Sequence, residues 1–289
     1  MIKIISHTSF WFIAVFGFSM MSCAQNESKT NQNQEKVDSK KETVMEKETV
    51  MENKMKVEIW SDVMCPFCYI GKRNFETAME QFADKDHIEV VWKSFQLDAS
   101  IPEVAKDSYE DYLIENKGMP RAQVKGMLDN VTQSAKQVGL EYNFDKAIMV
   151  NSLNAHKLLQ LAKTKGLGND AEELLFRAFF TDGKNIADIS TLTEIGEALG
   201  MDKTEIQTAF SDEKYAAMVK ADIQEARQVG VQGVPFFVLD RKYAVSGAQP
   251  AAAFLENLTK AFGEWREKNP VVKLEITQGQ SCAPDGTCE

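Results

Sequence analysis

The residues most able to do chemistry in this sequence are Cys65 and Cys68, which are separated by Pro66 and Phe67. In such a Cys-x-x-Cys pair one sulfur can attack a disulfide and the other can resolve the mixed disulfide that forms. The spacing alone also allows a structural disulfide or half of a zinc site. The elements around the pair separate these uses.

The pair lies where a short strand is expected to give way to a helix. Residues 55–60 alternate in the manner of a strand, and Pro66 suits the first turn of a helix. Cys65 would then lie at the helix N-terminus, where free backbone amides and the positive end of the helix dipole stabilise a thiolate. Cys68 would follow about one turn later, placed to attack a mixed disulfide formed at Cys65.

A second informative segment, residues 230–239, reads as a turn followed by a strand that opens with Pro235. The Val234–Pro235 bond is a candidate cis peptide, and the alternative is an ordinary trans proline that starts a strand. Because proline donates no ladder hydrogen bond, backbone groups beside it can pair with an extended peptide.

Together these segments resemble the DsbA-like branch of the thioredoxin superfamily, and within it the group related to FrnE and to 2-hydroxychromene-2-carboxylate isomerase. The resemblance covers roughly residues 55–268 and rests on residues 62–72, 151–156, 233–237 and 245–249. It implies that Cys65 is the nucleophile, that Cys68 resolves, and that Val234 with Pro235 contacts the substrate backbone. The related isomerases typically carry serine at the first position and use glutathione, so two cysteines favour redox chemistry.

The predicted fold is α/β, a thioredoxin fold with an inserted α-helical domain. Residues 55–100 and 230–268 form the thioredoxin-like part, and residues 101–229 form the helical insertion. Strands are expected at 88–97, after Pro235 and at 242–247, with no further strand between 97 and 235. Within the insertion, Asn151 or Ser152 can cap a helix that Gly166 ends, and residues 191–194 form a capping-box pattern.

The N-terminal residues read as an export signal and a tether. Lys3 and the apolar run 10–18 precede Ser-Met-Met-Ser-Cys23, which looks like a lipoprotein processing site with Cys23 as the acylated residue (segment 1–23). Residues 24–54 follow as a tether without aromatic side chains before Met55. This predicts a bacterial envelope protein, lipid-anchored on the periplasmic side or free in the periplasm. Ordinary cleavage, an uncleaved anchor, or an internal start giving a cytoplasmic form are the alternatives.

Export would make disulfides chemically accessible to the remaining cysteines. Cys282 and Cys288 flank a Pro-Asp-Gly turn in the tail 269–289 and form a candidate secondary redox pair. FrnE-like proteins often carry such a pair, although the spacing here is wider. An inert disulfide is an equal alternative, and a four-cysteine zinc site is a third; we expect no metal.

The charge of the chain argues against one functional class, and a few of the remaining residues are candidates for a role near the cysteines. The chain has 33 Lys and Arg against 43 Asp and Glu, a net charge of −10 without a basic cluster, which argues against nucleic-acid binding. Glu58 and Asp62 are candidate proton acceptors for the cysteines if they are buried. His156 is more often structural at such a position, and Phe176, Phe179 and Phe180 are expected to pack in the core.

The function predicted from these features is that of an exported thiol–disulfide oxidoreductase acting on protein or peptide thiols, recycled by a redox partner protein. It needs no cofactor beyond the redox-active disulfide, with glutathione as a candidate co-substrate, and it touches the membrane only through its lipid. The alternatives are a glutathione-dependent isomerase or transferase-like enzyme and a non-catalytic, peptide-binding lipoprotein.

Overall fold

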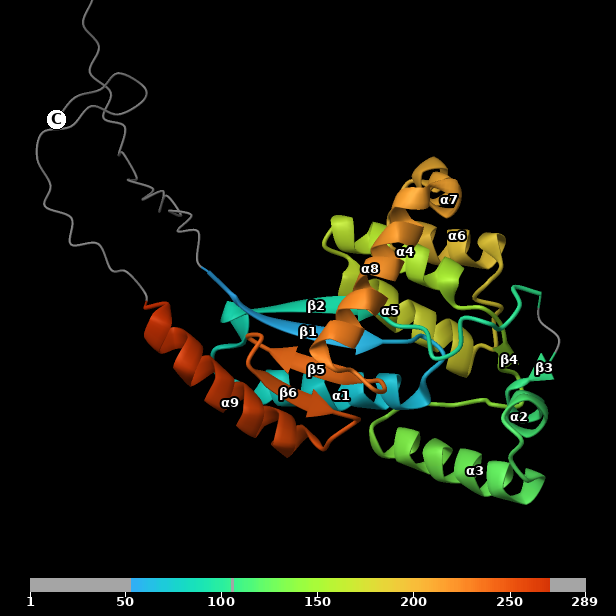
Figure 1. The fold of residues 1–289 in the computed structure, drawn as a ribbon, viewed down its shortest axis with the longest axis horizontal. Coiled ribbons are helices and arrows are strands. Elements are labelled where there is room, and N and C mark those ends of the chain that lie inside the picture. Colours follow the sequence, from blue (N-terminus) through green and yellow to red (C-terminus); the bar gives the residue numbers. More distant parts are fainter. Residues whose placement is uncertain (1–52, 105–106, 271–289) are drawn as a thin grey trace, which may run out of the picture. The chain divides into compact units, whose positions relative to one another are not determined.

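A four-stranded mixed sheet forms the centre of the protein in a computed structural model that describes residues 53–104 and 107–270. The strands are β1 (Met55–Ser61), β2 (Ile88–Ser94), β5 (Phe236–Leu239) and β6 (Tyr243–Ser246), in the order β2-β1-β5-β6 (Figure 1). β1 pairs with β2 in parallel, and the β1–β5 and β5–β6 pairs are antiparallel. Strand β1, which leads to Cys65, is therefore hydrogen-bonded on both sides.

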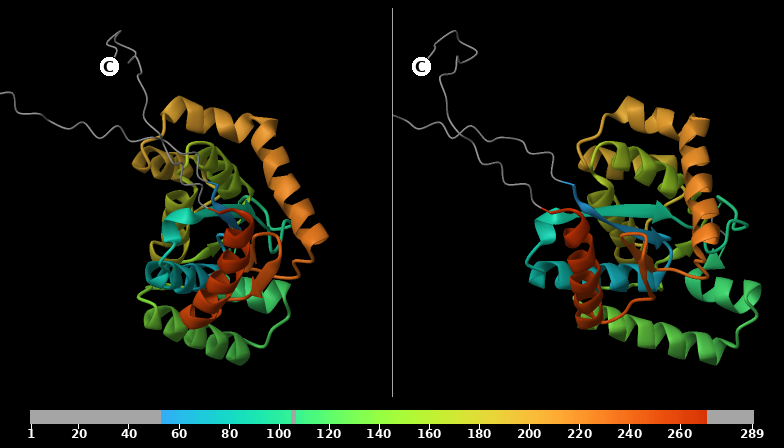
Figure 2. Two further views of the ribbon diagram at one scale, coloured as in Figure 1. Left: turned by 90° about the vertical axis from the view of Figure 1, so that its left-hand side faces the viewer. Right: turned by 60° about the vertical axis from the view of Figure 1, so that its left-hand side comes forward.

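Helices cover both faces of this sheet. α1 (Pro66–Gln81) and α9 (Ala251–Lys268) pack on one face, and α8 (Glu213–Val229) lies across the other (Figures 1 and 2). The two faces follow from the alternation of β1, because Val57 and Ile59 join the core around α1 whereas Trp60 packs with Ala226 of α8. The helix α9 ends at Lys268, just before Asn269 and Pro270, because the residue before a proline disfavours the helical conformation.

An aromatic group ties the α1 face together. Phe75 of α1, Phe237 of β5 and Phe254 of α9 have ring centroids 4.5–5.7 Å apart, and all three side chains are buried. Edge-to-face and tilted contacts of this kind add to the burial of apolar area. The N-terminal and C-terminal parts of the thioredoxin-like region are thus held in one core.

The insertion between β2 and β5 is mostly helical, as predicted. Its helices are α2 (Tyr109–Asp111), α3 (Arg121–Gln137), α4 (Leu153–Thr164), α5 (Gly168–Phe176), α6 (Ile189–Ala198), α7 (Lys203–Ser211) and α8, with π-helical turns at Tyr112–Asn116 and Arg177–Thr181. A 3₁₀ turn, Lys85–His87, lies outside it, before β2. Helix α3 runs beneath α1 (Figure 2), and α5 packs beside β2.

The prediction that no strand occurs between residues 97 and 235 was wrong. β3 (Asp107–Ser108) and β4 (Ile148–Met149) form a short antiparallel pair inside the insertion. Pairs of two residues leave no alternation for sequence reasoning to detect. The strand expected at 88–97 ends at Ser94, because the following backbone turns to bind Asp62 through the N–H of Leu97.

Helix caps differ in detail from the sequence pattern. α6 begins two residues before Thr191, because Asp188 caps it by accepting a hydrogen bond from the Thr191 N–H at 2.9 Å. At α4 it is the Asn151 carboxamide, not the Ser152 hydroxyl, that accepts the N–H of Leu153. Gly166 follows α4 with a φ of +73°, as a helix-ending glycine should.

Several predicted features lie outside the described residues: the signal with Cys23, the tether up to residue 52, and the tail from residue 271 on, with Cys282 and Cys288. Within residues 53–104 and 107–270, none of the helices combines the length and apolar character that a membrane crossing requires.

Candidate active site

Cys65 and Cys68 lie at the junction of β1 and α1. Cys65 occupies the N-cap position of α1 with an extended backbone, and Pro66 opens the helix. The Cys65 N–H donates to the Asp62 carbonyl at 2.8 Å, and the Cys68 N–H donates to the Cys65 carbonyl at 3.0 Å. The first thiol is therefore held at a helix N-terminus, as the sequence predicted.

The two thiols have different surroundings. Both are free and buried, with 4% of Cys65 and none of Cys68 exposed, while Phe67 between them is 47% exposed. Burial, and then the neighbouring Cys65, raises the pKa of the Cys68 thiol well above its ordinary value. An attacking partner can approach only the Cys65 end of the pair, and Cys68 holds its proton at rest.

The turn before β5 lies directly opposite Cys65. The Val234–Pro235 peptide bond is cis, as proposed from the sequence, and the Cys65 thiol lies 3.5 Å from the Val234 carbonyl oxygen. Gly71 of α1 makes this approach possible, because a Cβ there would lie 2.9 Å from Cγ of Pro235. The structure thus brings together Cys65, Val234 and Pro235, which are widely separated in sequence.

Asp62 organises the loop that carries Cys65. It is fully buried, and its carboxylate accepts the Met64 N–H at 3.3 Å and the Leu97 N–H at 2.7 Å. His156 of α4 is also fully buried, with its Nε2 3.5 Å from Asp62 Oδ1. Asp62 is the closer of the two acidic residues singled out in the sequence, and it binds the loop backbone.

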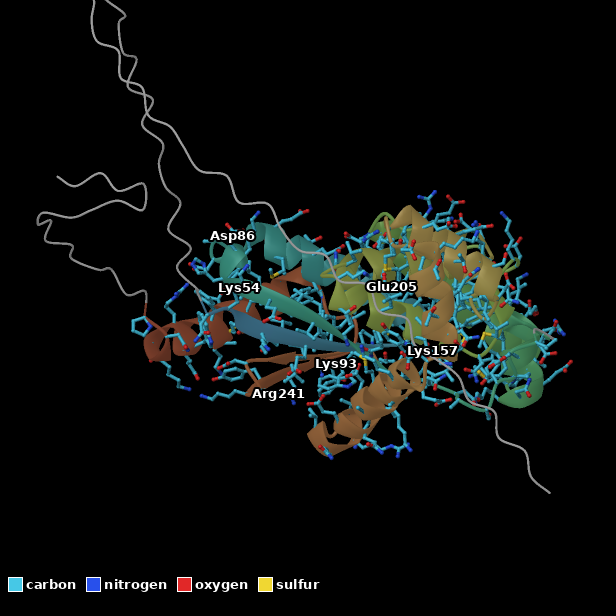
Figure 3. The ribbon with its side chains drawn as sticks, turned by 90° about the horizontal axis from the view of Figure 1, so that it is seen from above. Lys54, Asp86, Lys93, Lys157, Glu205 and Arg241 are labelled. Carbon is cyan, nitrogen blue, oxygen red and sulfur yellow. The ribbon has the colours of Figure 1, made fainter. Side chains whose placement is uncertain are left out.

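Glu58, the other candidate proton acceptor, faces away from the cysteines. Its buried carboxylate pairs with Arg241 and lies 3.6 Å from the Lys93 ammonium. Figure 3 shows Lys93 and Arg241 beside the sheet, and both also pair with Glu225 of α8. Because Glu58 is held in this ion-pair group, its role is structural.

Two tyrosines from the insertion contact the backbone of the cysteine loop through their hydroxyl groups. The Tyr142 hydroxyl donates to the Pro66 carbonyl at 2.6 Å, and the Tyr109 hydroxyl lies 3.5 Å from the Met64 carbonyl. Burial raises the pKa of both phenols, so they remain neutral donors. The predicted core residues Phe176, Phe179 and Phe180 are fully buried beside them, and Tyr142 stacks on Phe180 at 4.7 Å.

Helix α5 is joined to α1 by a group of charged side chains. Glu173 accepts hydrogen bonds from Lys72, Arg73 and Tyr69. Burial opposes ionisation of Glu173, but the hydrogen bonds from Arg73, Lys72 and Tyr69 outweigh it and hold its pKa at about 2. Since the Lys72 side chain is only 2% exposed, this group fixes the insertion against the active-site helix.

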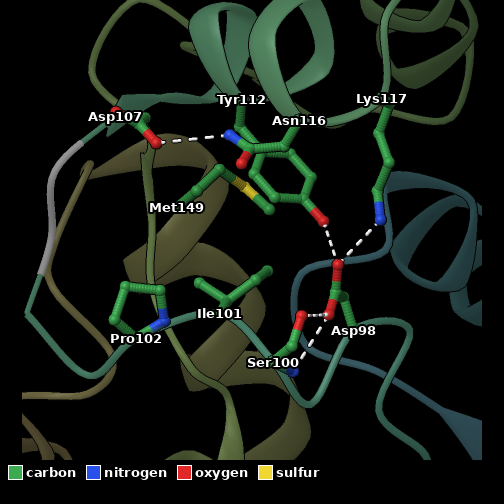
Figure 4. Close-up of a pocket in the computed structure, with 9 residues that line it drawn as sticks. All are labelled: Asp98, Ser100, Ile101, Pro102, Asp107, Tyr112, Asn116, Lys117 and Met149. Atoms are coloured by element: carbon green, nitrogen blue, oxygen red, sulfur yellow. Dashed lines mark hydrogen bonds and ion pairs between the residues drawn. The ribbon is translucent and has the colours of Figure 1, made fainter.

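A polar pocket of about 300 Å³ lies beyond the loop that Asp62 binds (Figure 4). Its Asp98 carboxylate, adjacent to Leu97, accepts hydrogen bonds from the Tyr112 hydroxyl at 2.5 Å and from Lys117 at 2.7 Å. Hydrogen bonds from Lys117, Ser100 and Tyr112 hold the pKa of Asp98 well below its usual range. These hydrogen bonds hold Asp98, and with it the backbone next to Leu97, in place.

Comparison with models of known families shows which family the chain belongs to. Residues 56–259 match the model of the DsbA-like thioredoxin domain. The chain belongs to the DsbA-like thioredoxin family. The predicted thioredoxin fold with a helical insertion is confirmed, and the family is one of thiol–disulfide oxidoreductases.

The chain is also similar to individual proteins in sequence or in fold. A probable DsbA oxidoreductase from Streptomyces coelicolor is 38% identical, with 81% of this chain and 98% of that chain covered and a TM-score of 0.69. The uncharacterized protein YwbO of Bacillus subtilis is 27% identical over 73% of this chain and 98% of its own length. A 2-hydroxychromene-2-carboxylate isomerase shares the fold at 17% identity, covering 76% of this chain and 100% of that chain, with a TM-score of 0.53.

Sequence reasoning missed several residues of the DsbA-like site. Ser61, at the end of β1, and Glu172 of α5 are both buried and hydrogen-bonded to each other. Tyr142 supports the cysteine loop, and Gly71 admits the proline turn. Of these residues, only Glu172 could have been found from the sequence, since it lies four residues before Phe176 on the apolar side of its helix.

Proposed function

We propose that this protein is an exported thiol–disulfide oxidoreductase that exchanges disulfides with protein or peptide thiols through Cys65 and Cys68. The observation that carries the proposal is the position of the Cys65 thiol at the N-terminus of α1, 3.5 Å from the Val234 carbonyl oxygen. A peptide lying along the Val234–Pro235 turn would present its sulfur to Cys65. Cys68 follows Cys65 on the next turn of α1 and is placed to attack the mixed disulfide that forms at Cys65.

The reaction balances with two thiols and one disulfide. In the reducing direction the Cys65 thiolate attacks a substrate disulfide, forms a mixed disulfide and releases one substrate thiolate. Cys68 then loses its proton and attacks the Cys65 sulfur, which releases the second substrate thiolate and leaves a Cys65–Cys68 disulfide. Two electrons pass to the substrate, and a redox partner protein, or glutathione, returns them. The oxidising direction is the reverse.

The surface near Cys65 supports a peptide as the substrate. Phe67 is 47% exposed and Leu97, whose N–H binds Asp62, is 51% exposed. Exposed apolar side chains beside a reactive thiol favour contact with unfolded or extended chains over small polar thiols. Val234 and Pro235 are the residues we expect to contact the substrate backbone.

The cellular setting of the proposal rests on the sequence. Acylation at Cys23 would anchor the protein at the periplasmic side of a bacterial envelope, with residues 24–54 as its tether. Cys282 and Cys288 would form a second dithiol that passes electrons to or from Cys65 and Cys68. Globomycin-sensitive processing and its loss in Cys23→Ser would test the anchor, and processing that survives the substitution would refute it.

Insulin-disulfide reduction and oxidation of a reduced dithiol peptide by the purified protein test the activity. We expect turnover in at least one direction, loss of it in Cys65→Ser, and a mixed disulfide trapped in Cys68→Ser. Absence of both activities would refute the proposal.

A chain that ends before Cys282 should turn over more slowly if the tail pair exchanges electrons with the site, and unchanged turnover would remove the pair from the reaction.

A glutathione-dependent isomerase is the competing enzyme, and the fold likeness to the isomerase supports it as the second candidate. The related isomerases work with serine in the first position, so Cys65→Ser should preserve isomerase activity and abolish redox activity. A binding lipoprotein without chemistry would bind reduced peptides equally well after Cys65→Ser and would show no turnover.

A further inference from the structure

A groove of about 320 Å³ lies along α8. This helix covers the face of the sheet opposite the cysteine helix α1 (Figure 1). The α8 wall of the groove consists of residues that recur every three or four positions, which places them on one side of the helix. Among them are Ala216, Lys220, Ile223 and Arg227. Gln96, beyond the end of β2, and Leu153, the first residue of α4, form the other wall.

Both walls of this α8 groove are joined to the elements that hold the cysteine loop. Gln96 is adjacent to Leu97, whose N–H donates to Asp62 at 2.7 Å. On the other side, the chain leaves α8 and Val231 packs in one apolar cluster with Val234, which forms the cis turn. A chain held at the candidate active site can therefore continue into the groove past the exposed side chain of Leu97.

The charged side chains of the α8 groove are cations without partners. Lys220 and Arg227 are exposed, and among the described residues neither forms an ion pair or a side-chain hydrogen bond. The acidic residues Asp222 and Glu225 of the same helix are instead paired with Lys93, at 3.3 Å and 2.9 Å. On a protein with a net charge of −10, two unpaired cations in one groove are complementary to carboxylates.

Between the two cations the α8 groove is apolar. Ile223 lies between Lys220 and Arg227 along the helix, and it lines the groove together with Leu153; both apolar side chains are half-buried. At about 1.5 Å per residue, the helix wall from Ala216 to Arg227 is about 17 Å long, which matches about five residues of an extended chain. The groove therefore suits a short segment in which apolar and acidic side chains alternate.

We propose that the α8 groove binds acidic, amphipathic segments of client proteins, next to the client cysteine that reacts with Cys65. The inference rests on the function proposed above and names the class of client. Lys220 and Arg227 bind carboxylates of the segment, and Ile223 contacts its apolar side chains. Contacts remote from the sulfur hold the client while the sulfur reacts, so clients with such a segment react faster than clients without one.

Peptides with matched flanks test this preference. Each carries one cysteine in a disulfide with thionitrobenzoate, next to the flank Asp-Leu-Glu-Leu-Asp, Ser-Leu-Gln-Leu-Ser or Lys-Leu-Lys-Leu-Lys, before the cysteine in one set and after it in a second. The full-length chain is used, with Cys23, Cys282 and Cys288 replaced by serine. Attack by Cys65 joins the peptide to the protein and releases thionitrobenzoate, the better leaving group, whose absorbance gives the rate constant. Rates with dithiothreitol correct for the intrinsic reactivity of each peptide.

Reversal of the two charges should reverse the preference. We expect the acidic flank to react fastest and the basic flank slowest with the unaltered groove. Lys220→Glu combined with Arg227→Glu should lower the acidic-to-neutral ratio of rate constants about tenfold, the size expected when two exposed ion pairs become repulsions. The same variant should raise the basic-to-neutral ratio. Structural damage would slow all three peptides and would not exchange their order.

Lys125→Glu combined with Lys136→Glu is the matched control. It changes the net charge by the same amount, and both lysines are exposed on α3, away from the groove. This control should keep the ratios of the unaltered groove. Added salt should lower the acidic-to-neutral ratio of the unaltered protein, because exposed charges are screened.

The outcomes separate the two proposals. A Cys65 that reacts with none of the peptides would refute the oxidoreductase function. Reaction with ratios that the Lys220 and Arg227 reversals leave unchanged, or that the α3 control changes equally, would overturn the role of the groove and leave the function standing.

Two other occupants of the groove give results of their own. If the acidic end of the tail occupied it, a chain that ends before residue 282 would show a higher acidic-to-neutral ratio because a competitor is removed. If a second copy occupied it, sedimentation would show a dimer that the Lys220 and Arg227 reversals convert to a monomer. Either result would overturn the assignment to a client segment.

Discussion

Replacing Gly71 with alanine tests how closely the cysteine helix and the proline turn must fit. The added Cβ would lie 2.9 Å from Cγ of Pro235 and 3.5 Å from Cα of Ala248. Non-bonded carbon atoms rest at about 3.5–4.0 Å, so the proline ring must retreat by about half an ångström. Because Val234 precedes that ring, its carbonyl would move relative to the Cys65 thiol.

The magnitude follows from two opposing effects. Overpacking a tight contact costs about 1–3 kcal/mol. Alanine in a helix interior gains about 0.5–1 kcal/mol over glycine. We therefore expect Gly71→Ala to lower the free energy of unfolding by about 1 kcal/mol. A misplacement of 1 Å can cost about 100-fold in rate, so the shift of half that size should slow disulfide exchange about tenfold.

Gly126→Ala is the matched control, since Gly126 lies on the exposed side of α3 and a Cβ there meets no atom within 4 Å. It should stabilise the protein by about 0.5–1 kcal/mol and leave exchange unchanged. Urea unfolding and insulin-reduction rates measure both quantities. A Gly71→Ala protein that matches Gly126→Ala in stability and rate would refute the close fit.

Three other changes probe the site. In a Cys65→Ser background, Cys68 should resist iodoacetamide at pH 8–9, because burial raises its pKa and excludes the reagent; mass spectrometry follows the reaction, and rapid labelling would contradict this. Tyr142→Phe removes the hydrogen bond to the Pro66 carbonyl and should lower the free energy of unfolding by about 1–2 kcal/mol in urea titrations. Glu173 ionises at a pKa of about 2, below its ordinary value, so it stabilises the fold above pH 4.5 and loses this as pH falls toward 2. The stability advantage of wild type over Glu173→Gln, about 2 kcal/mol near neutral pH, should therefore shrink over that range in acid titrations.

The parts of the site that the sequence predicted are those with a local signature. Cys65 at a helix start follows from a strand pattern and a proline within a dozen residues. The turn at Val234–Pro235 carries its own glycine and proline signals. Local patterns can be read without knowledge of partners, and the resemblance to the DsbA-like family then joined the two segments.

The parts that escaped prediction depend on contacts between distant elements. Ser61 is an ordinary strand-end residue until Glu172, 111 residues away, is placed beside it. Glu58 and Asp62 looked equivalent in sequence, and only their partners distinguish them, since Glu58 pairs with Arg241 whereas Asp62 accepts backbone N–H groups of the cysteine loop and of Leu97. The two-residue strands β3 and β4 likewise depend on the closing of the insertion. Burial and partner choice arise from packing, which periodicity does not encode.

The distance along the chain between Cys65 and Val234, 169 residues, has a consequence for biogenesis. A growing or incompletely folded chain contains both cysteines long before the Val234–Pro235 turn opposite them exists. Its thiols would then be reactive without any selection of partner. Because pairings across long sequence separations form late, productive activity should emerge only when β5 docks on β1. Until then the two thiols lack the turn that we expect to select their partner.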